Sequence, residues 1–150
     1  MSFEDAAVLP LAGLTALQGL RDQTALPMTG ATERVLIVGA SGGVGHLGLQ
    51  IARSTGAHVT GVCSGKNVAA VRGLGADDVV DYTQGEAAWA GKGPFDVILD
   101  CVADAPGDWT PRLAKKGRYA STLPGPKTFL RMAANPLTGQ KVKPVLLKSN

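Results

Sequence analysis

The hydrophobic positions of this chain fall into short unbroken runs that alternate with stretches of helical spacing. Residues 34–55 show this most clearly, because Val-Leu-Ile-Val at 35–38 is a run rich in β-branched residues. Such a run is typical of a parallel strand that is buried on both faces. After a glycine-rich turn, apolar and small residues recur every three or four positions from Val44 to Thr55. This stretch therefore predicts a strand, a tight turn and a helix with one face on a sheet.

The same alternation continues along the rest of the chain. Further strands are predicted at 57–62, 78–81, 95–101, 117–122 and 142–147, and helices at 9–22, 66–74, 108–113 and 128–134. The first helix is placed at 9–22 because Pro10 suits only the first turn of a helix. Strands separated by helices predict an α/β fold with a doubly wound parallel sheet. Right-handed crossovers and the position of the glycine turn favour six strands in the order 3-2-1-4-5-6, a Rossmann fold.

The glycine-rich turn between the first strand and its helix reads GASGGVG from Gly39 to Gly45. Glycines allow a diphosphate to approach the backbone, and the helix start offers unpaired N–H groups with a positive dipole end. The dinucleotide fingerprint G-x-G-x-x-G is matched with Ala40 in place of its first glycine. The alternative is a turn that binds nothing, but the strand and helix around it favour a phosphate site. Its predicted contacts are Ser41, Gly42, Gly43 and Val44.

Composition and charge narrow the classes of function. With 150 residues, of which 45% are hydrophobic, the chain suits one domain. The net charge of +3 comes from residues 123–150, which hold five basic residues and no acidic one. No aromatics are interleaved with them, so a solvated face or a surface that meets another part of a larger protein is favoured over nucleic-acid binding.

Signals for other compartments and for metals are missing from the sequence. No apolar run is long enough for a membrane span, and the start shows no secretory signal, so we expect a cytoplasmic protein. The two cysteines, Cys63 and Cys101, have neither C-x-x-C nor histidine spacing, which argues against a metal site or a disulfide framework. His46 and His58 also lack partners at catalytic or metal-binding spacing.

The carboxyl ends of the strands predict the cofactor contacts, because ligands of such sheets lie there. An NAD site usually places an acid about 20 residues past the fingerprint, to bind the ribose hydroxyls. The segment after the second strand instead offers Ser64 and Lys66, which suit a 2′-phosphate and hence NADP(H). The alternative for Lys66 is an ordinary solvated lysine.

Three further residues are candidate contacts. Cys101 and Val102 end the fourth strand, beside the expected nicotinamide ribose, and Cys101 is assigned contact and not catalysis. Tyr82 packs on the adenosine end or simply covers the sheet edge, and the sequence leaves both open. The acids Asp77, Asp78 and Asp81 lie around a strand, where alternate side chains diverge, so they are interpreted as structural.

Several ordered motifs resemble a known family. They are AAVLPLAGLTALQGL, VGASGGVG, VCSGKNVAAVRGLGADDVVDY and FDVILDCV. Together they resemble the cofactor domain of the medium-chain dehydrogenase/reductase superfamily, in its zinc-independent quinone oxidoreductase branch. The resemblance implies NADPH-dependent reduction of quinones or of the C=C bond of α,β-unsaturated carbonyls. It also implies that Thr15 lies near the nicotinamide carboxamide, Gly42 to Val44 under the diphosphate, and Ser64, Lys66 and Tyr82 around the 2′-phosphate.

The family also has a catalytic domain that this sequence lacks. We therefore expect residues 1–150 to be one NADP-binding domain, excised or truncated, with no catalytic residue of its own and no turnover in isolation. The alternative is a non-enzymatic nucleotide-sensing or interaction module, which the length of the natural reading frame would distinguish. The last predicted strand, 142–147, would be a sheet edge that allows a homodimer, although Pro144 removes one donor.

Overall fold

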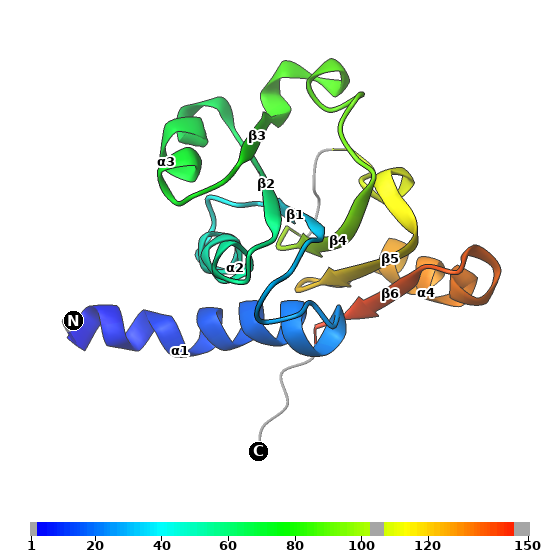
Figure 1. Cartoon of the computed structure of the whole chain (residues 1–150), viewed down its shortest axis with the longest axis horizontal. Coiled ribbons are helices and arrows are strands. Elements are labelled where there is room, and N and C mark those ends of the chain that lie inside the picture. Colours follow the sequence, from blue (N-terminus) through cyan, green and yellow to red (C-terminus); the bar gives the residue numbers. More distant parts are fainter. Residues whose placement is uncertain (1–2, 103–106, 146–150) are drawn as a thin grey trace.

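A six-stranded parallel sheet forms the centre of the molecule, with the strand order β3-β2-β1-β4-β5-β6 (Figure 1). The computed structural model describes residues 3–102 and 107–145. The predicted topology is therefore confirmed. The strands are β1 (Arg34–Val38), β2 (His58–Cys63), β3 (Asp78–Asp81), β4 (Phe95–Asp100), β5 (Leu113–Ser121) and β6 (Lys141–Pro144).

Both faces of the sheet are buried, which explains why its central strands have unbroken apolar runs. In β1, Val35 and Ile37 belong to one core cluster, while Leu36 and Val38 belong to the other. All four side chains are at most 1% exposed. The run at 35–38 thus supplies two layers of core from one strand.

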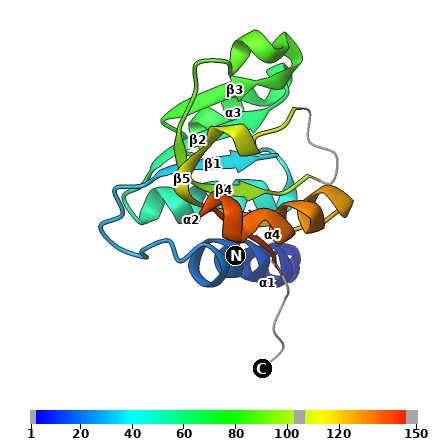
Figure 2. The ribbon, with the colours of Figure 1, turned by 90° about the vertical axis from the view of Figure 1, so that its right-hand side faces the viewer.

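Helices and short turns cover the two faces (Figures 1 and 2). The helices are α1 (Phe3–Leu17), the π-helical η1 (Gln18–Gln23), α2 (Gly43–Ser54), α3 (Val68–Gly73) and α4 (Pro126–Thr138), and the 3-10 turns are η2 (Gly65–Asn67), η3 (Tyr82–Gln84), η4 (Glu86–Ala88) and η5 (Thr110–Arg112). Leu20 of η1, Leu49 of α2 and Val71 of α3 pack on the first cluster. Trp89 and Trp109 belong to the second cluster, and Met132 of α4 packs against it. α1 lies on α2, and the absence of a side chain at Gly48 of α2 leaves room for Leu99 of β4, because a Cβ there would lie 3.0 Å from Leu99 Cδ2.

Some boundaries differ from those that the sequence predicts. The first helix begins at Phe3, so Pro10 lies in its interior, and it continues as η1 instead of ending as one regular helix at residue 22. An interior proline loses one backbone hydrogen bond and crowds the carbonyl group four residues earlier. The alanine and leucine residues on both sides of Pro10 are strong helix formers, and they favour continuation of the helix through it. β5 begins at Leu113, four residues before the predicted start, because its pairing with β4 is irregular between Phe95 and Val97.

Candidate functional site

The glycine-rich turn packs so tightly that two of its glycines cannot carry a side chain. Gly39 has a φ of +78°, and a Cβ there would lie 2.5 Å from Cγ2 of Val102. A Cβ at Gly45 would overlap the carbonyl oxygen of Gly39. Gly39 therefore makes the sharp turn that the fingerprint assigns to its first glycine. The alignment of Ala40, Gly42 and Gly45 with the fingerprint is unchanged by this, and Ala40, which stands in its first glycine position, is fully buried in the core.

The amino end of α2 is open to a ligand. Gly42 is its N-cap and supplies no side-chain hydrogen bond, and no acidic residue lies in the first turn. A Cβ at Gly43 would meet no protein atom within 4 Å, so the space above this turn is free. The amides of a first helical turn have no partner within the helix. This cradle fits the diphosphate of a dinucleotide.

A cavity of about 620 Å³ lies beside this helix end. It holds five of the predicted contacts: Thr15, Gly42, Gly43, Val44 and Cys101. The sequence did not identify six other lining residues: Leu11, Ala12, Gly45, Thr122, Leu123 and Val145. Thr122 directly follows β5, so the rule that ligands lie at carboxyl ends of strands could have found it. Leu11 comes from α1, whose placement depends on its packing against α2.

Two hydroxyl groups give the cavity its polar character. Thr15 Oγ1 donates to the carbonyl oxygen of Leu11 at 2.7 Å, and Thr122 Oγ1 donates to the carbonyl oxygen of Asp100 at 3.3 Å. Because each hydroxyl proton is used inside the protein, the oxygen lone pairs remain as acceptors. Such acceptors suit the NH₂ group of a carboxamide.

The contacts predicted for the adenosine end form a separate cluster outside the cavity. Nδ2 of Asn67 donates to Ser41 Oγ at 3.0 Å and to Ser64 Oγ at 3.2 Å. It therefore ties the glycine turn to the end of β2. Lys66 lies in η2 and is exposed. The sequence did not single out Asn67, because the link depends on how two loops meet.

A carboxylate also lies at this end, although β2 itself ends without an acid. Asp81, at the end of β3, accepts hydrogen bonds from the Gly65 amide, from both Thr83 donors and from Gln84. These bonds, with that of the Thr83 hydroxyl the strongest, hold the pKa of Asp81 below its usual value. The interpretation of Asp81 as structural agrees with these bonds, but its charge is a neighbour of the proposed phosphate site.

The remaining predicted contacts pack into the protein. Tyr82 is half-buried against the second core cluster, so it covers the sheet there. Val102 is half-buried in the same cluster and touches the glycine turn. Neither residue lines the cavity.

The Cys101 thiol should be unreactive near neutral pH. Burial, with a smaller effect of the Asp100 charge, raises its pKa to about 12, against a smaller contribution of the Thr122 hydroxyl, which can turn from the Asp100 carbonyl oxygen to donate to the thiolate. The nucleophile is the thiolate, so alkylation at pH 7 should be slow. Since an unfolded thiol ionises near its ordinary value of 9.0, the protein should lose stability as the pH rises above that value. Labelling by iodoacetamide at pH 7, followed by mass spectrometry, tests the low reactivity of the thiol. Rapid labelling of Cys101 in the folded chain would contradict it.

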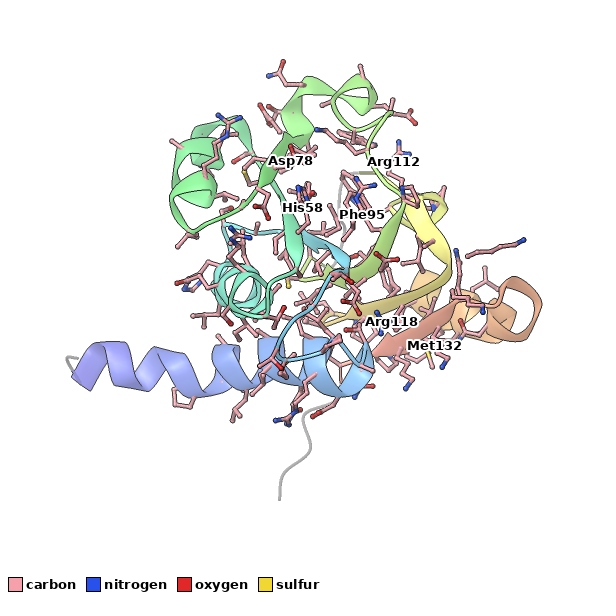
Figure 3. All side chains as sticks on the ribbon, in the orientation of Figure 1. His58, Asp78, Phe95, Arg112, Arg118 and Met132 are labelled. Atoms are coloured by element: carbon pink, nitrogen blue, oxygen red, sulfur yellow. The ribbon has the colours of Figure 1, made fainter. Side chains whose placement is uncertain are left out.

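The histidines lie in ordinary structural surroundings. Nδ1 of His46 is 3.0 Å from the Gly42 carbonyl oxygen. His58 starts β2, at the end of the strands away from the cavity, with Nε2 3.9 Å from an Asp78 carboxylate oxygen of β3 (Figure 3). Within residues 3–102 and 107–145, no three His, Cys, Asp or Glu side chains are placed to hold a metal ion.

Comparison with known proteins gives consistent matches. Residues 43–121 match the family model described as zinc-binding dehydrogenase. The chain is 39% identical to the chloroplast envelope quinone oxidoreductase homolog of Arabidopsis thaliana, over 95% of this chain and 46% of that protein. It is 43% identical to the mitochondrial NAD(P)H oxidoreductase RTN4IP1 of Homo sapiens, over 77% of this chain and 30% of that protein.

A solved structure matches the fold over the whole chain. The quinone oxidoreductase from Coxiella burnetii superposes with a TM-score of 0.84 at 31% identity, over 100% of this chain and 46% of that one. The chain thus spans about half the length, or less, of the proteins that it matches.

The expected cytoplasmic location is wrong. The Arabidopsis thaliana and Homo sapiens relatives carry chloroplast and mitochondrial names, which point to an organelle. The expectation rested on the lack of a secretory signal and of a membrane span, and neither feature distinguishes the cytoplasm from an organelle interior. In the part of the chain that the structure describes, helices with the length and apolar character of a bilayer span are absent.

Proposed function

The chain belongs to the zinc-binding dehydrogenase family, in the quinone oxidoreductase branch of the medium-chain dehydrogenase/reductase superfamily, and from this premise we propose what the whole protein does. It is an NADPH-dependent reductase of quinones or α,β-unsaturated carbonyls, for which these residues bind the cofactor. The observation that carries the proposal is the open amino end of α2 beside a cavity of about 620 Å³. Both lie at the switch point between β1 and β4, where such sheets bind dinucleotides.

The residues of this chain bind and orient the cofactor. The first-turn amides of α2 hold the diphosphate, with Gly43 leaving it room. Thr15 and Thr122 accept hydrogen bonds from the carboxamide and so fix the orientation of the nicotinamide ring. When bound, the cofactor supplies a hydride. Leu11 and Leu123, which are 67% and 54% exposed, form an apolar wall of the cavity. Such a wall suits a neutral substrate as the acceptor of the hydride.

The cofactor class is a nicotinamide dinucleotide, and we propose NADP(H) as the preferred form. Supporting this choice, Lys66 places a cation and Ser64 a hydroxyl after β2, and Asn67 joins Ser64 to Ser41 of the glycine turn. The Asp81 carboxylate beside Gly65 opposes the choice, so the preference is expected to be moderate.

A deuterium-transfer experiment tests the activity. Full-length protein is incubated with NADPH deuterated at C4 and either a quinone or an enone, and the label is followed into the product. We expect saturable transfer by the full-length protein and negligible turnover by residues 1–150, since the acceptor is positioned across a cleft between two domains. Cofactor binding without transfer by the full-length protein would favour the sensing module instead.

Two other sequence-based expectations remain predictions. β6 ends the sheet in the described part of the chain, so its outer edge can pair with a second copy. Val142 lies within β6, whereas residues 146 and 147 of the predicted strand lie outside the described residues. A homodimer through this edge predicts twice the monomer mass by light scattering, and a strictly monomeric mass at high concentration would contradict it.

Zinc-independent chemistry predicts full activity of full-length protein after chelation, and activity that returns only with zinc would contradict it.

A further inference from the structure

A buried polar pair lies between β4 and β5, close to the cavity but outside it. Tyr119 Oη donates to Asp100 Oδ2 at 2.5 Å, and the two residues are 3% and 7% exposed. Tyr119 belongs to the apolar cluster of Trp109, Ile98 and Val142. A carboxylate in such surroundings is costly unless hydrogen bonds satisfy it. A pair of this kind suggests a role in positioning.

The second oxygen of the same carboxylate fixes the turn that follows β4. The Val102 amide donates to Asp100 Oδ1 at 3.0 Å. The Val102 side chain in turn touches Gly39, where it fills the space that a Cβ would need. The carboxylate thereby sets the distance between the end of β4 and the glycine turn.

The main chain of Asp100 holds two walls of the cavity. Its carbonyl oxygen accepts a hydrogen bond from the Thr122 amide at 2.9 Å as well as from the Thr122 hydroxyl. The next residue, Cys101, donates its amide to the Val38 carbonyl oxygen at 3.0 Å. Cys101 and Thr122 both line the cavity, so their spacing depends on where Asp100 is held.

We propose that the Asp100–Tyr119 pair is a positioning pair for the cofactor. It locks the carboxyl ends of β4 and β5 to the glycine turn, in the spacing that receives the nicotinamide ribose and carboxamide. Neither side chain lines the cavity, so both act through Val102, Cys101 and Thr122. This inference rests on the proposed cofactor site.

Titration of residues 1–150 with NADPH and with NADH, followed by calorimetry, tests the pair. Tyr119→Phe removes one hydrogen bond and little volume. We expect the Kd for both cofactors to rise about tenfold, the order of change that follows loss of a hydrogen bond to a charged group. The single variant Asp100→Asn should keep nearly the affinity of the unchanged chain. Its amide oxygen can accept from the Val102 amide, while its NH₂ group donates to the Tyr119 hydroxyl.

A matched control separates positioning from stability alone. Thr55→Val removes another buried hydroxyl, which donates to the Ala52 carbonyl oxygen at 2.7 Å at the far end of α2. It should lower the urea midpoint about as much as Tyr119→Phe and leave Kd unchanged. Amide exchange of Val102 is a second readout, which Tyr119→Phe should accelerate while Thr55→Val does not.

The outcomes separate the two proposals. If the unchanged chain binds cofactor but Tyr119→Phe alters only the urea midpoint, the pair is merely structural and the inference fails. If Asp100→Asn binds as weakly as Tyr119→Phe, the hydrogen-bond geometry is not what matters, and the inference also fails. If the unchanged, folded chain binds neither cofactor, the proposed cofactor site itself is wrong.

Discussion

Alanine at position 45 is expected to destroy both the fold of the glycine turn and cofactor binding. Its Cβ would overlap the Gly39 carbonyl oxygen and lie 2.7 Å from the Gly39 carbonyl carbon and 3.0 Å from Ala40 Cα. These are backbone atoms, which cannot move aside as a flexible side chain can. Overpacking commonly costs about 1–3 kcal/mol, and we expect the loss for Gly45→Ala to reach at least about 3 kcal/mol. Urea unfolding of residues 1–150, with and without NADPH, measures both effects.

Two further alanine variants separate the turn's role in folding from its role in binding. Gly43→Ala meets no protein atom, so the fold should remain intact while the methyl group enters the space assigned to the diphosphate. We expect cofactor affinity to fall without loss of stability. Gly73→Ala, at the end of α3, also meets no protein atom and lies away from the cavity, so it should change neither. Normal cofactor affinity in Gly43→Ala would show that the diphosphate lies elsewhere.

NADPH is expected to bind about tenfold more tightly than NADH. One charge-assisted hydrogen bond contributes roughly 1.5–3 kcal/mol, and exposure of Lys66 keeps the gain at the lower end. Lys66→Ala should remove the preference by weakening NADPH while NADH binding changes little. Ser64→Asp should reverse the preference, since it places a second negative charge beside Asp81 and can bind ribose hydroxyls. Calorimetric titrations at low and moderate salt measure this, and salt should weaken the preference.

The lysine control for this experiment lies at the opposite end of the strands from the proposed phosphate site. Lys92 pairs with Asp78 at 3.6 Å, at the amino end of β3, so Lys92→Ala removes a cation without touching the proposed site. The NADPH preference should stay unchanged in this variant. Tighter NADH binding by the unmodified chain, or a preference that survives both Lys66→Ala and Ser64→Asp, would mean that the phosphate site is misplaced.

Local patterns predicted the parts of the site that depend on neighbouring residues in sequence. The run at 35–38, the glycine turn and the helical spacing after Val44 predicted β1, the cradle and α2, because each is set by a few consecutive residues. The positive φ of Gly39 was missed, because Gly39 precedes the residues that match the fingerprint, Ala40, Gly42 and Gly45, and only the backbone shows that the chain turns there.

The parts of the site that sequence reasoning missed depend on contacts between distant elements. Leu11 reaches the cavity because α1 packs on α2, and Asn67 bridges two loops that are far apart in sequence. Asp81 comes to the end of β2 through the register of the neighbouring strand, in which Cys63 pairs with Asp81. The early start of β5 follows from an irregular pairing that no period of hydrophobic residues reveals.

Backbone amide NMR of residues 1–150 during titration with NADPH tests the central claim most directly. The diphosphate at the amino end of α2 predicts saturable shifts that are largest for Gly43, Val44 and Gly45, with a second group at Cys101 and Thr122. Gly43→Ala should reduce these shifts at equal cofactor concentration while the remaining spectrum stays that of the folded chain. A folded chain whose spectrum does not change at millimolar NADPH, or changes saturably only away from the glycine turn, would contradict the claim.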